Sequence, residues 1–241
     1  MIEIKHISKG FEGKSIIEDI NAQFLPGRCN LIIGASGSGK TVLTKCIVDL
    51  IHPDQGEVIF DGVSSHDMSD NQKKQLRQSI GMLFQGNALF DSMTVEENVR
   101  FPLDMFTSLH HNEKTNRVNT ILERVNLHEV NLKYPSELSG GMKKRVALAR
   151  AVVTNPKYLF CDEPNSGLDP QTSLVIDRLI QGITVEKNIT TIVVTHDMNS
   201  LMEIGDYILF LHKGKKEWEG SNKEIIYSQN TILNDFIFAS E

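Results

Sequence analysis

The residues best suited to chemistry in this chain form the run Gly34-Ala35-Ser36-Gly37-Ser38-Gly39-Lys40-Thr41, which fits the phosphate-binding pattern G-x-x-x-x-G-K-[ST] at every fixed position. Its glycines let the backbone come close to oxygen atoms, so that successive N–H groups point at a triphosphate. The Lys40 ammonium would neutralise the β- and γ-phosphates, and the Thr41 hydroxyl would ligate Mg²⁺. The run therefore predicts a cradle for a nucleoside triphosphate.

The flanks of this run support the same interpretation. Residues 31–33 are a short apolar run typical of a buried parallel strand. Apolar residues then repeat along one face of a following helix, at Val42, Leu43, Cys46, Ile47 and Leu50. A Gly/Ser-rich turn that merely joins two elements is the simpler alternative, but it does not explain a lysine and a threonine at the required offsets. On its own, the run indicates a P-loop nucleoside triphosphatase and nothing narrower.

Further polar residues follow other predicted strands. Asp162 and Glu163 end an apolar strand at residues 158–161, and His196 follows a second buried strand at residues 191–195. Gln85 ends a third, at residues 80–84. Ligands of parallel α/β sheets bind at the carboxyl ends of the strands, so these residues are expected to meet at one sheet edge.

Composition restricts the class of protein. The chain has 241 residues, 40% of them hydrophobic, which suffices for the core of one domain. A net charge of −6 argues against a nucleic-acid binder. Apolar runs fall far short of the ~20 residues that span a bilayer, and the first residues alternate like a strand, so we expect a cytoplasmic protein. The three cysteines are predicted to be reduced core residues, and His110-His111 a solvated pair rather than a zinc site.

The periodicity changes along the chain and predicts its organisation. Residues 1–86 and 156–220 show short apolar strands and are assigned to an α/β core, whereas residues 87–155 show helical periods and are assigned to a helical subdomain. Thr94 and Glu97 form a capping box for a short helix that is expected to stop before Pro102. Residues 221–241 are expected to add two short helices, the last over residues 231–239.

The segment Leu138-Ser139-Gly140-Gly141-Met142, lying upstream of Asp162-Glu163, completes a set that resembles the nucleotide-binding subunit of ABC transporters along essentially the whole chain. The resemblance implies a single domain with the P-loop ABC ATPase fold. This is an α/β RecA-like core with an N-terminal antiparallel β region and an inserted α-helical subdomain. It also implies an ATPase whose hydrolysis of ATP, with Mg²⁺, energises transport by a separate membrane permease.

The resemblance assigns roles to single residues. Phe11 is expected to stack on adenine, although a lone aromatic here fits a core position equally well. Gln85 is expected to approach Mg²⁺ and to link the core to the helical subdomain, and Asp162 to hold Mg²⁺ through water. Glu163 is the expected base that polarises the attacking water, and His196 the switch histidine at the γ-phosphate.

The resemblance also implies partners. Ser139, Gly140 and Gly141 would act on the ATP held by the opposite subunit, so that two copies close head to tail as a homodimer around two nucleotides. The segment Ser166-Gly167-Leu168-Asp169 would be the D-loop of that interface. An integral membrane permease would hold the ATPase at the cytoplasmic face of the inner membrane, and no nucleic acid is expected as a partner.

Two segments carry a narrower resemblance. Residues 83–99 and residues 136–145 look like those of Mla-type ATPases, which drive phospholipid traffic across the envelope of double-membraned bacteria. Phospholipid transport with a lipid-binding accessory subunit is therefore the main hypothesis. The ATPase of an importer for osmolytes or amino acids is the alternative, because Met142 is shared with some osmolyte importers.

Two alternatives lie outside transport. A soluble ABC ATPase that acts on ribosomes or DNA is disfavoured, because such proteins usually carry two cassettes or a long insertion. The acidic charge also gives no basic face. A simple P-loop GTPase leaves residues 138–142, here called the signature segment, as well as Gln85 and His196 without a role.

Overall fold

A six-stranded sheet, in the order β10-β9-β3-β8-β7-β6, lies at the centre of the molecule. Five strands run parallel, and β10 pairs antiparallel with β9 at one edge. The computed structural model describes residues 1–238. Its central strands are β3 (Arg28–Ile33), β6 (Ile80–Leu83), β7 (Tyr158–Asp162), β8 (Thr190–Val194), β9 (Tyr207–His212) and β10 (Lys215–Gly220). The continuous apolar runs of β3, β7 and β8 are buried on both faces, as expected for parallel strands.

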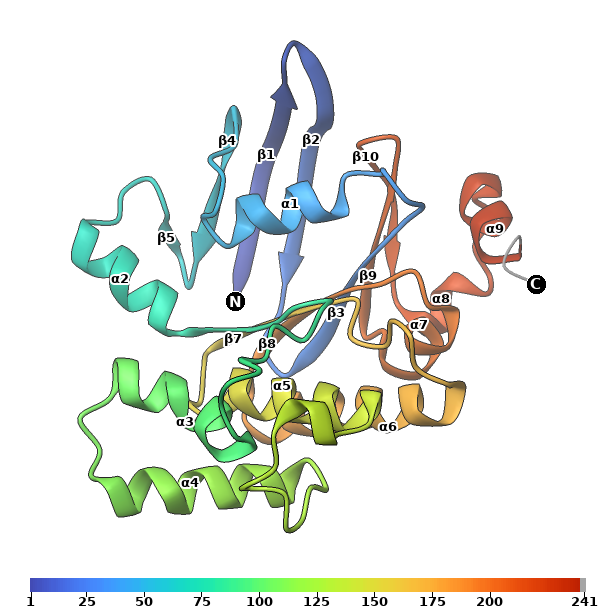
Figure 1. Ribbon diagram of the computed structural model, residues 1–241. Helices are drawn as coiled ribbons and strands as arrows, with labels where there is room; N and C mark the ends of the chain where they lie inside the picture. Colours follow the sequence, from blue (N-terminus) through green and yellow to red (C-terminus); the bar gives the residue numbers. More distant parts are fainter. Residues whose placement is uncertain (239–241) are drawn as a thin grey trace.

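A second, antiparallel sheet in the order β2-β1-β4-β5 stands beside the central one (Figure 1). Its strands are β1 (Ile2–Phe11), β2 (Lys14–Phe24), β4 (Gln55–Phe60) and β5 (Val63–Ser64). Alternate residues of β1 and β2 point inward, and they share one buried cluster with Leu43 and Ile47 of α1 (Lys40–Ile47) and with Phe160 of the central sheet. One apolar layer therefore joins the two sheets through the helix that follows the phosphate loop.

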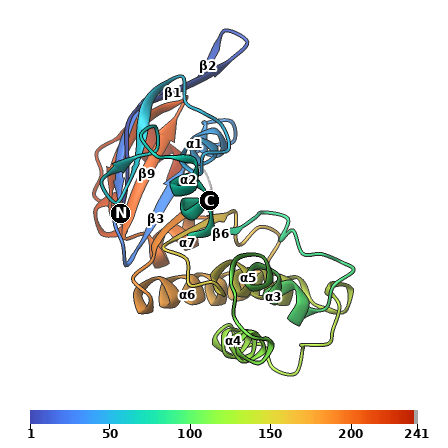
Figure 2. The ribbon, with the colours of Figure 1, turned by 90° about the vertical axis from the view of Figure 1, so that its left-hand side faces the viewer.

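Helices cover the other face of the central sheet, with α4 farthest from it (Figure 2). They share a second buried cluster with β3, β6, β7, β8 and β9. The helices of this layer are α3 (Val95–Phe106), α4 (His111–Arg124), α5 (Gly140–Val152) and α6 (Pro170–Glu186). Smaller elements complete the described chain, namely α2 (Asp70–Gln78), the 3-10 turn η1 (Pro135–Glu137), α7 (Met198–Ile204), α8 (Asn222–Ile225) and α9 (Thr231–Phe238).

The expected end of the helix after Thr94 is wrong. The capping box is present, with the Glu97 N–H donating to Thr94 Oγ1 and the Thr94 N–H to Glu97, but α3 continues through Pro102 to Phe106. Proline removes one backbone hydrogen bond from a helix interior. Full burial of Leu103, directly after the proline, outweighs that loss and keeps the last turn helical.

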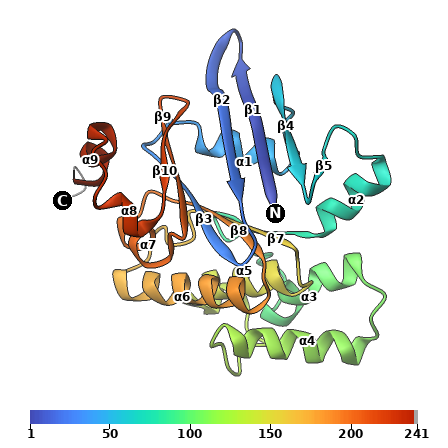
Figure 3. The same ribbon diagram turned by 180° about the vertical axis from the view of Figure 1, so that it is seen from behind.

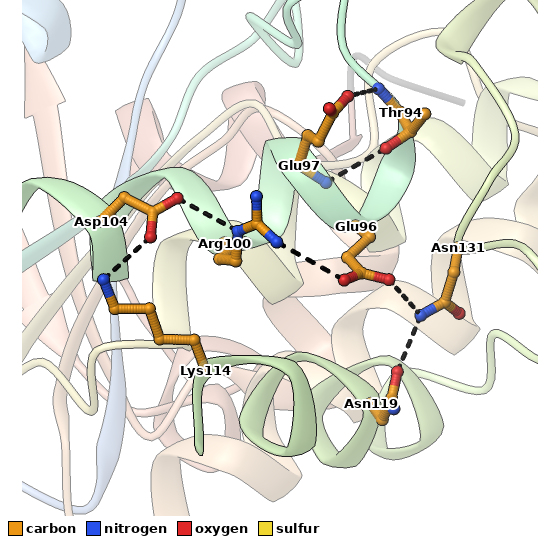
Figure 4. A network of polar contacts seen from close by, with 8 residues as sticks. All are labelled: Thr94, Glu96, Glu97, Arg100, Asp104, Lys114, Asn119 and Asn131. Carbon is orange, nitrogen blue, oxygen red and sulfur yellow. Dashed lines mark hydrogen bonds and ion pairs between the residues drawn. The ribbon is translucent and has the colours of Figure 1, made fainter. Parts of the chain in front are cut away.

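Ion pairs across the proline support the same turn and join α3 to α4 (Figure 4). Arg100 Nε donates to Asp104 at 3.1 Å, and its guanidinium lies 3.7 Å from Glu96. Lys114 of α4 reaches the other Asp104 oxygen at 2.9 Å, while the Asn131 amide donates to Glu96 at 3.1 Å. Burial raises the pKa of Asp104, but the hydrogen bonds and charges of Lys114 and Arg100 together outweigh it, so the pKa is lowered. The helical layer thus has a fixed arrangement.

The C-terminal helices α8 and α9 lie beside the β9–β10 edge (Figure 3). The Phe236 ring of α9 lies 5.1 Å from the Phe210 ring of β9. The predicted end of this helix at Ala239 lies outside the described residues. Among residues 1–238, no helix has both the length and the apolar character to cross a membrane. All three cysteines are buried and free, as predicted.

We predict that Gly81→Ala destabilises the fold by about 1–3 kcal/mol, because its β6 strand packs against the end of α5 without room for a side chain. An added Cβ would lie 2.1 Å from the Ala151 carbonyl oxygen and 3.1 Å from the Pro156 ring. Urea unfolding measures the loss. Gly86→Ala is the matched control, because an added Cβ there meets nothing within 4 Å. Equal midpoints for the two variants would contradict the prediction.

Candidate active site

The register of three parallel strands brings the predicted polar residues to one edge. Ile32 of β3 and Asp162 of β7 both pair with Val194 of β8. The residues that come next on each strand therefore emerge side by side: the phosphate loop after β3, Glu163 after β7, and His196 two residues after β8. The expected meeting of these groups at the carboxyl ends of the strands is present in the structure.

The phosphate loop has the geometry of an anion cradle. Gly34 has a φ of 150°, and an added Cβ there would lie 2.3 Å from the Leu211 carbonyl oxygen, so only glycine fits. Helix α1 begins directly after Gly39 without a side-chain cap, which leaves its first N–H groups to other acceptors. The Ser38 hydroxyl is buried and has no hydrogen-bond partner in the described structure. Phosphate oxygens would satisfy all of these donors.

The charge of Lys40 is held inside this loop. Its ammonium donates to the carbonyl oxygens of Gly34 at 2.6 Å and Ala35 at 3.1 Å. Burial lowers the pKa of Lys40, and the nearby negative charges of Glu163 and Asp162 oppose that shift. Burial also raises the pKa of Asp162, with Glu163 adding to the effect and Lys40 opposing it. A cation and two carboxyl groups thus share one partly desolvated edge.

Glu163 and His196 form a contact pair, with 2.8 Å between Glu163 Oε1 and His196 Nδ1. The Glu163 side chain is 14% exposed and the His196 ring 68%. The backbone of Glu163 is left-handed, at φ 48°, which costs on the order of 1 kcal/mol for a residue with a side chain. Strain of this kind at a carboxylate aimed at a histidine is typical of a catalytic position.

The residues that could hold Mg²⁺ are few. Thr41 is exposed in the first turn of α1, and Asp162 ends β7. No group of three or more His, Cys, Asp and Glu side chains within residues 1–238 could hold a metal ion by itself. Magnesium that binds with phosphate oxygens needs only one or two protein ligands, so the donor set fits a metal that arrives with a nucleotide.

Most of the remaining predicted residues lie at the surface, but Gly141 is buried, and an added Cβ there would lie 2.6 Å from the Thr172 side chain of α6. Gln85 is exposed two residues beyond β6, and Ser139 and Gly140 are exposed at the start of α5. Phe11 lies at the β1–β2 hairpin with 47% exposure, and the Lys9 ammonium is 5.4 Å from its ring. The core alternative for Phe11 is thereby wrong, while its stacking on adenine stays a prediction.

Residues 17–166 match the family model described as ABC transporter, which is more than half of the chain. The chain belongs to the ABC transporter family. The ATPase activity expected from its resemblance to this family is confirmed.

Curated relatives of this ABC transporter chain differ in the function that their names give. The methionine import ATP-binding protein MetN of Desulfitobacterium hafniense is 39% identical and covers 98% of this chain and 71% of that protein. The intermembrane phospholipid transport system ATP-binding protein MlaF of Haemophilus influenzae is 37% identical, over 98% of this chain and 90% of that protein. The probable ribonucleotide transport ATP-binding protein mkl of Mycobacterium leprae is 34% identical, over 98% and 68%.

Solved structures confirm the predicted ABC ATPase fold. The dimeric ATP-binding cassette MJ0796, in a post-hydrolysis state with ADP and Pi, matches with a TM-score of 0.82 and 31% identity, over 92% of this chain and 99% of that one. The structure of cbiO1 from Clostridium perfringens, part of the ABC transporter complex cbiONQ, matches with a TM-score of 0.87 and 30% identity, over 97% and 93%.

Sequence patterns did not indicate three features of the site, the first two of which line or contact its loops. The C-terminal helix contributes Ile237 and Phe238 to a cavity of about 610 Å³ that Glu163 and His196 also line. Lys144 lies in α5, the signature helix, which begins within the signature segment, and it is buried against the loops of the site. Neither could be found from spacing, because each depends on packing between segments far apart in the chain.

A third such feature is a buried network behind the D-loop. The Asp177 carboxylate of α6 is inaccessible to solvent and accepts hydrogen bonds from the Asn165 amide at 2.9 Å and the Ser200 hydroxyl at 2.9 Å. Burial raises the pKa of Asp177 to about 6, and the two hydrogen bonds only partly oppose it. Asn165 precedes the D-loop and Ser200 belongs to α7, which follows His196, so the network joins two segments of the active-site edge.

The raised pKa of Asp177 predicts a pH-dependent stability. Between pH 4 and pH 6 the folded state retains a proton that the unfolded chain releases, so the free energy of unfolding falls as pH rises. A pKa of Asp177 raised from 3.8 to about 6 corresponds to a change of about 3 kcal/mol in the free energy of unfolding. Asp177→Asn keeps the shape and removes this slope, as urea unfolding at pH 4 and pH 7 would show. Asp91→Asn, at an exposed site, is the control and should follow the parent. An Asp177→Asn slope equal to that of the parent would contradict the prediction.

Proposed function

We propose that the chain is the ATP-hydrolysing subunit of an ABC transporter that moves phospholipids in the cell envelope. The observation that carries this proposal is the placement of the segment 83–99, whose sequence resembles Mla-type ATPases. It supplies Phe84, Ala88 and Phe90 to a largely apolar groove of about 390 Å³ beside Gln85. The identity to Haemophilus influenzae MlaF, over nearly the full length of both proteins, supports the same cargo.

The groove is suited to an apolar helix of a permease. Its other wall comes from Phe101, Pro102 and Phe106 of α3, and Arg150 of α5 lies at its base. Arg150 donates to the carbonyl oxygens of Asn87 and Ala88, at 2.9 and 2.7 Å, and holds the segment after Gln85 in place. A permease in this groove would hold the ATPase at the cytoplasmic face of the inner membrane. A lipid-binding accessory subunit completes the proposed transporter.

The geometry supports a separate role for each of these residues in ATP hydrolysis. The loop 34–41 would bind the phosphates through its N–H groups and Lys40. Thr41 and Asp162, with Gln85 nearby, would hold Mg²⁺, which supplies charge neutralisation at the phosphates. Glu163 would orient and deprotonate the attacking water, and His196 would keep the Glu163 carboxylate in position while contacting the γ-phosphate.

Completion of the site would require a second copy of this chain. Ser139 and Gly140 are exposed at the uncovered start of α5, where N–H groups and the helix dipole favour an anion. Head-to-tail pairing would bring this surface to the ATP on the partner's phosphate loop. The dimeric cassette MJ0796, with its similar fold, supports this arrangement.

An importer of small solutes is the second candidate. MetN proteins, named for methionine import, reach 37–40% identity to this chain, which equals or exceeds the 37% of MlaF. This agrees with the amino acid importer considered from the sequence. The two candidates share the ATPase mechanism and differ in the permease and its cargo.

The proposed base gives a direct prediction. Glu163→Gln should lower the turnover of ATP by about 10²- to 10⁴-fold while ATP binding is retained, because the amide cannot accept the proton of water. Phosphate release measures turnover, and equilibrium binding of a fluorescent ATP analogue measures affinity. Lys40→Ala should instead lose binding as well. Turnover at the parental rate in Glu163→Gln would show that Glu163 is not the base.

The cargo is tested in native membranes. Glu163→Gln with ATP should trap the closed dimer on its permease, so the complex can be isolated in detergent and its proteins and lipids identified by mass spectrometry. A multi-span permease with a membrane-anchored lipid-binding subunit and phospholipid is the expected result. A permease with a soluble solute-binding protein would support the importer instead. Recovery of an intact ATP-bound dimer without any membrane protein would contradict a transport role.

Two further variants, made in the Glu163→Gln background, test the apolar groove and the proposed dimer surface separately. Phe106→Glu, in the apolar groove, should lose the permease and keep the dimer. Leu132→Glu is the matched control, because Leu132 is 82% exposed and lies outside the groove. Ser139→Arg should lose the dimer itself through steric and charge conflict at the partner's nucleotide.

A further inference from the structure

Lys144 makes an unusual set of contacts from inside the signature helix. Its side chain is 3% exposed, and its ammonium donates to the Gln85 carbonyl oxygen at 2.9 Å, the Glu163 carbonyl oxygen at 3.3 Å and the Ser166 hydroxyl at 3.3 Å. An ammonium has three hydrogens to donate, so these acceptors use its full capacity. One buried side chain therefore joins α5 to two loops of the active-site edge, the one after β6 that carries Gln85 and the one after β7 that carries Glu163 and Ser166.

A buried lysine without a carboxylate in contact is costly, because desolvation disfavours its charge. Burial lowers the pKa of Lys144, and the nearby carboxyl groups of Glu163 and Asp162 act in the opposite direction. Apart from the Ser166 hydroxyl, the acceptors are backbone carbonyls, so the ammonium fixes the course of the main chain rather than pairing with a side-chain charge.

We propose that Lys144 is a positioning residue that couples the signature helix to the loops carrying Gln85, Glu163 and Ser166. The inference rests on the roles proposed above for Gln85 and Glu163. Lys144 is not one of the residues proposed above to contact ATP or the attacking water. It acts through the main chain of the residues that do.

The effect on Glu163 follows from its backbone. Its left-handed conformation, at φ 48°, turns the carboxylate towards His196. The carbonyl oxygen of Glu163 receives hydrogen bonds from the Lys144 ammonium and from the Ser166 N–H at 3.2 Å. Both bonds favour the strained conformation over an extended one. Loss of the ammonium would let the carboxylate sample orientations that are unproductive for proton abstraction.

Through α5, the contacts of Lys144 would also connect the nucleotide site of the partner subunit to that of its own subunit. Ser139, the cap of α5, lies five residues before Lys144, a distance of about 7.5 Å along a rigid helix. In the proposed dimer, Ser139 meets the ATP of the partner subunit. A displacement of the helix by that ATP would be passed through Lys144 to Gln85 and Glu163 of its own subunit. Lys144 thereby couples the state of one nucleotide site to the geometry of the other.

The test compares Lys144→Met with Lys143→Met in the full-length protein. Lys143 neighbours Lys144 on the same helix, is partly exposed and has no role in the proposed machinery. We expect Lys144→Met to lower kcat for ATP by at least about tenfold, with KM and the Kd of ATP unchanged within about twofold, since substrate contacts remain. Lys144→Arg, which keeps a buried donor cation, should recover most of kcat. Lys143→Met should match the parent.

The outcomes separate positioning from simple structural support. A kcat within about threefold of the parent in folded Lys144→Met would overturn the proposal. So would a joint loss of kcat, ATP affinity and melting temperature that Lys144→Arg does not restore. If Lys144→Met does not fold, Lys144→Gln takes its place with the same criteria, because its shorter, neutral side chain has two N–H donors and cannot replace all three hydrogen bonds of the ammonium. Glu163→Gln is measured alongside: parental turnover there refutes the proposed base, whereas its inactivity with normal Lys144 variants refutes only the coupling.

Discussion

The parallel register of β3, β8 and β7 is the constraint on which the rest of the site depends. Because Ile32 and Asp162 pair with the same residue of β8, three strand ends stop at one level. Chain segments that are more than 100 residues apart in the sequence then need only one or two further residues to reach a common ligand. The antiparallel sheet, α1 and the helical layer hold this register by burying both faces of the strands. No local sequence could bring the phosphate loop, Glu163 and His196 together without it.

Two buried lysines place positive charge at this edge, each in a different position. Lys40 lies within the phosphate loop and Lys144 lies behind it, and each binds carbonyl oxygens while two carboxyl groups lie nearby. In the proposed mechanism the first lysine binds the phosphates, and the second holds the loops that carry Gln85 and Glu163. Burial lowers the pKa of both lysines, because each cation is partly desolvated at this edge. Cationic groups at this edge offset the crowding of Asp162 and Glu163.

Local signals made much of the fold predictable. The phosphate loop, the capping box of Thr94 and Glu97 and the buried strands all follow from short patterns of residue type, and the structure contains each of them. The helix after Thr94 was mispredicted, because burial of Leu103 and the ion pairs of Arg100 act from outside the local sequence. The contacts of Lys144 and the Asp177 network could not be predicted, since a lysine or an aspartate has the same local pattern whether buried or exposed. The stacking of Phe11 on adenine depends on a ligand and stays a prediction.

The backbone of Glu163 has a consequence for how this chain responds to selection. Glycine or asparagine at that position would adopt φ 48° at less cost, and so would raise stability while removing the carboxylate. With Glu163 as the proposed base, activity and stability therefore oppose each other at a single residue. A library screened for thermal tolerance alone would drift towards inactive proteins at position 163. Variants that gain tolerance and keep the glutamate must gain it elsewhere, in surfaces and loops remote from the strand ends.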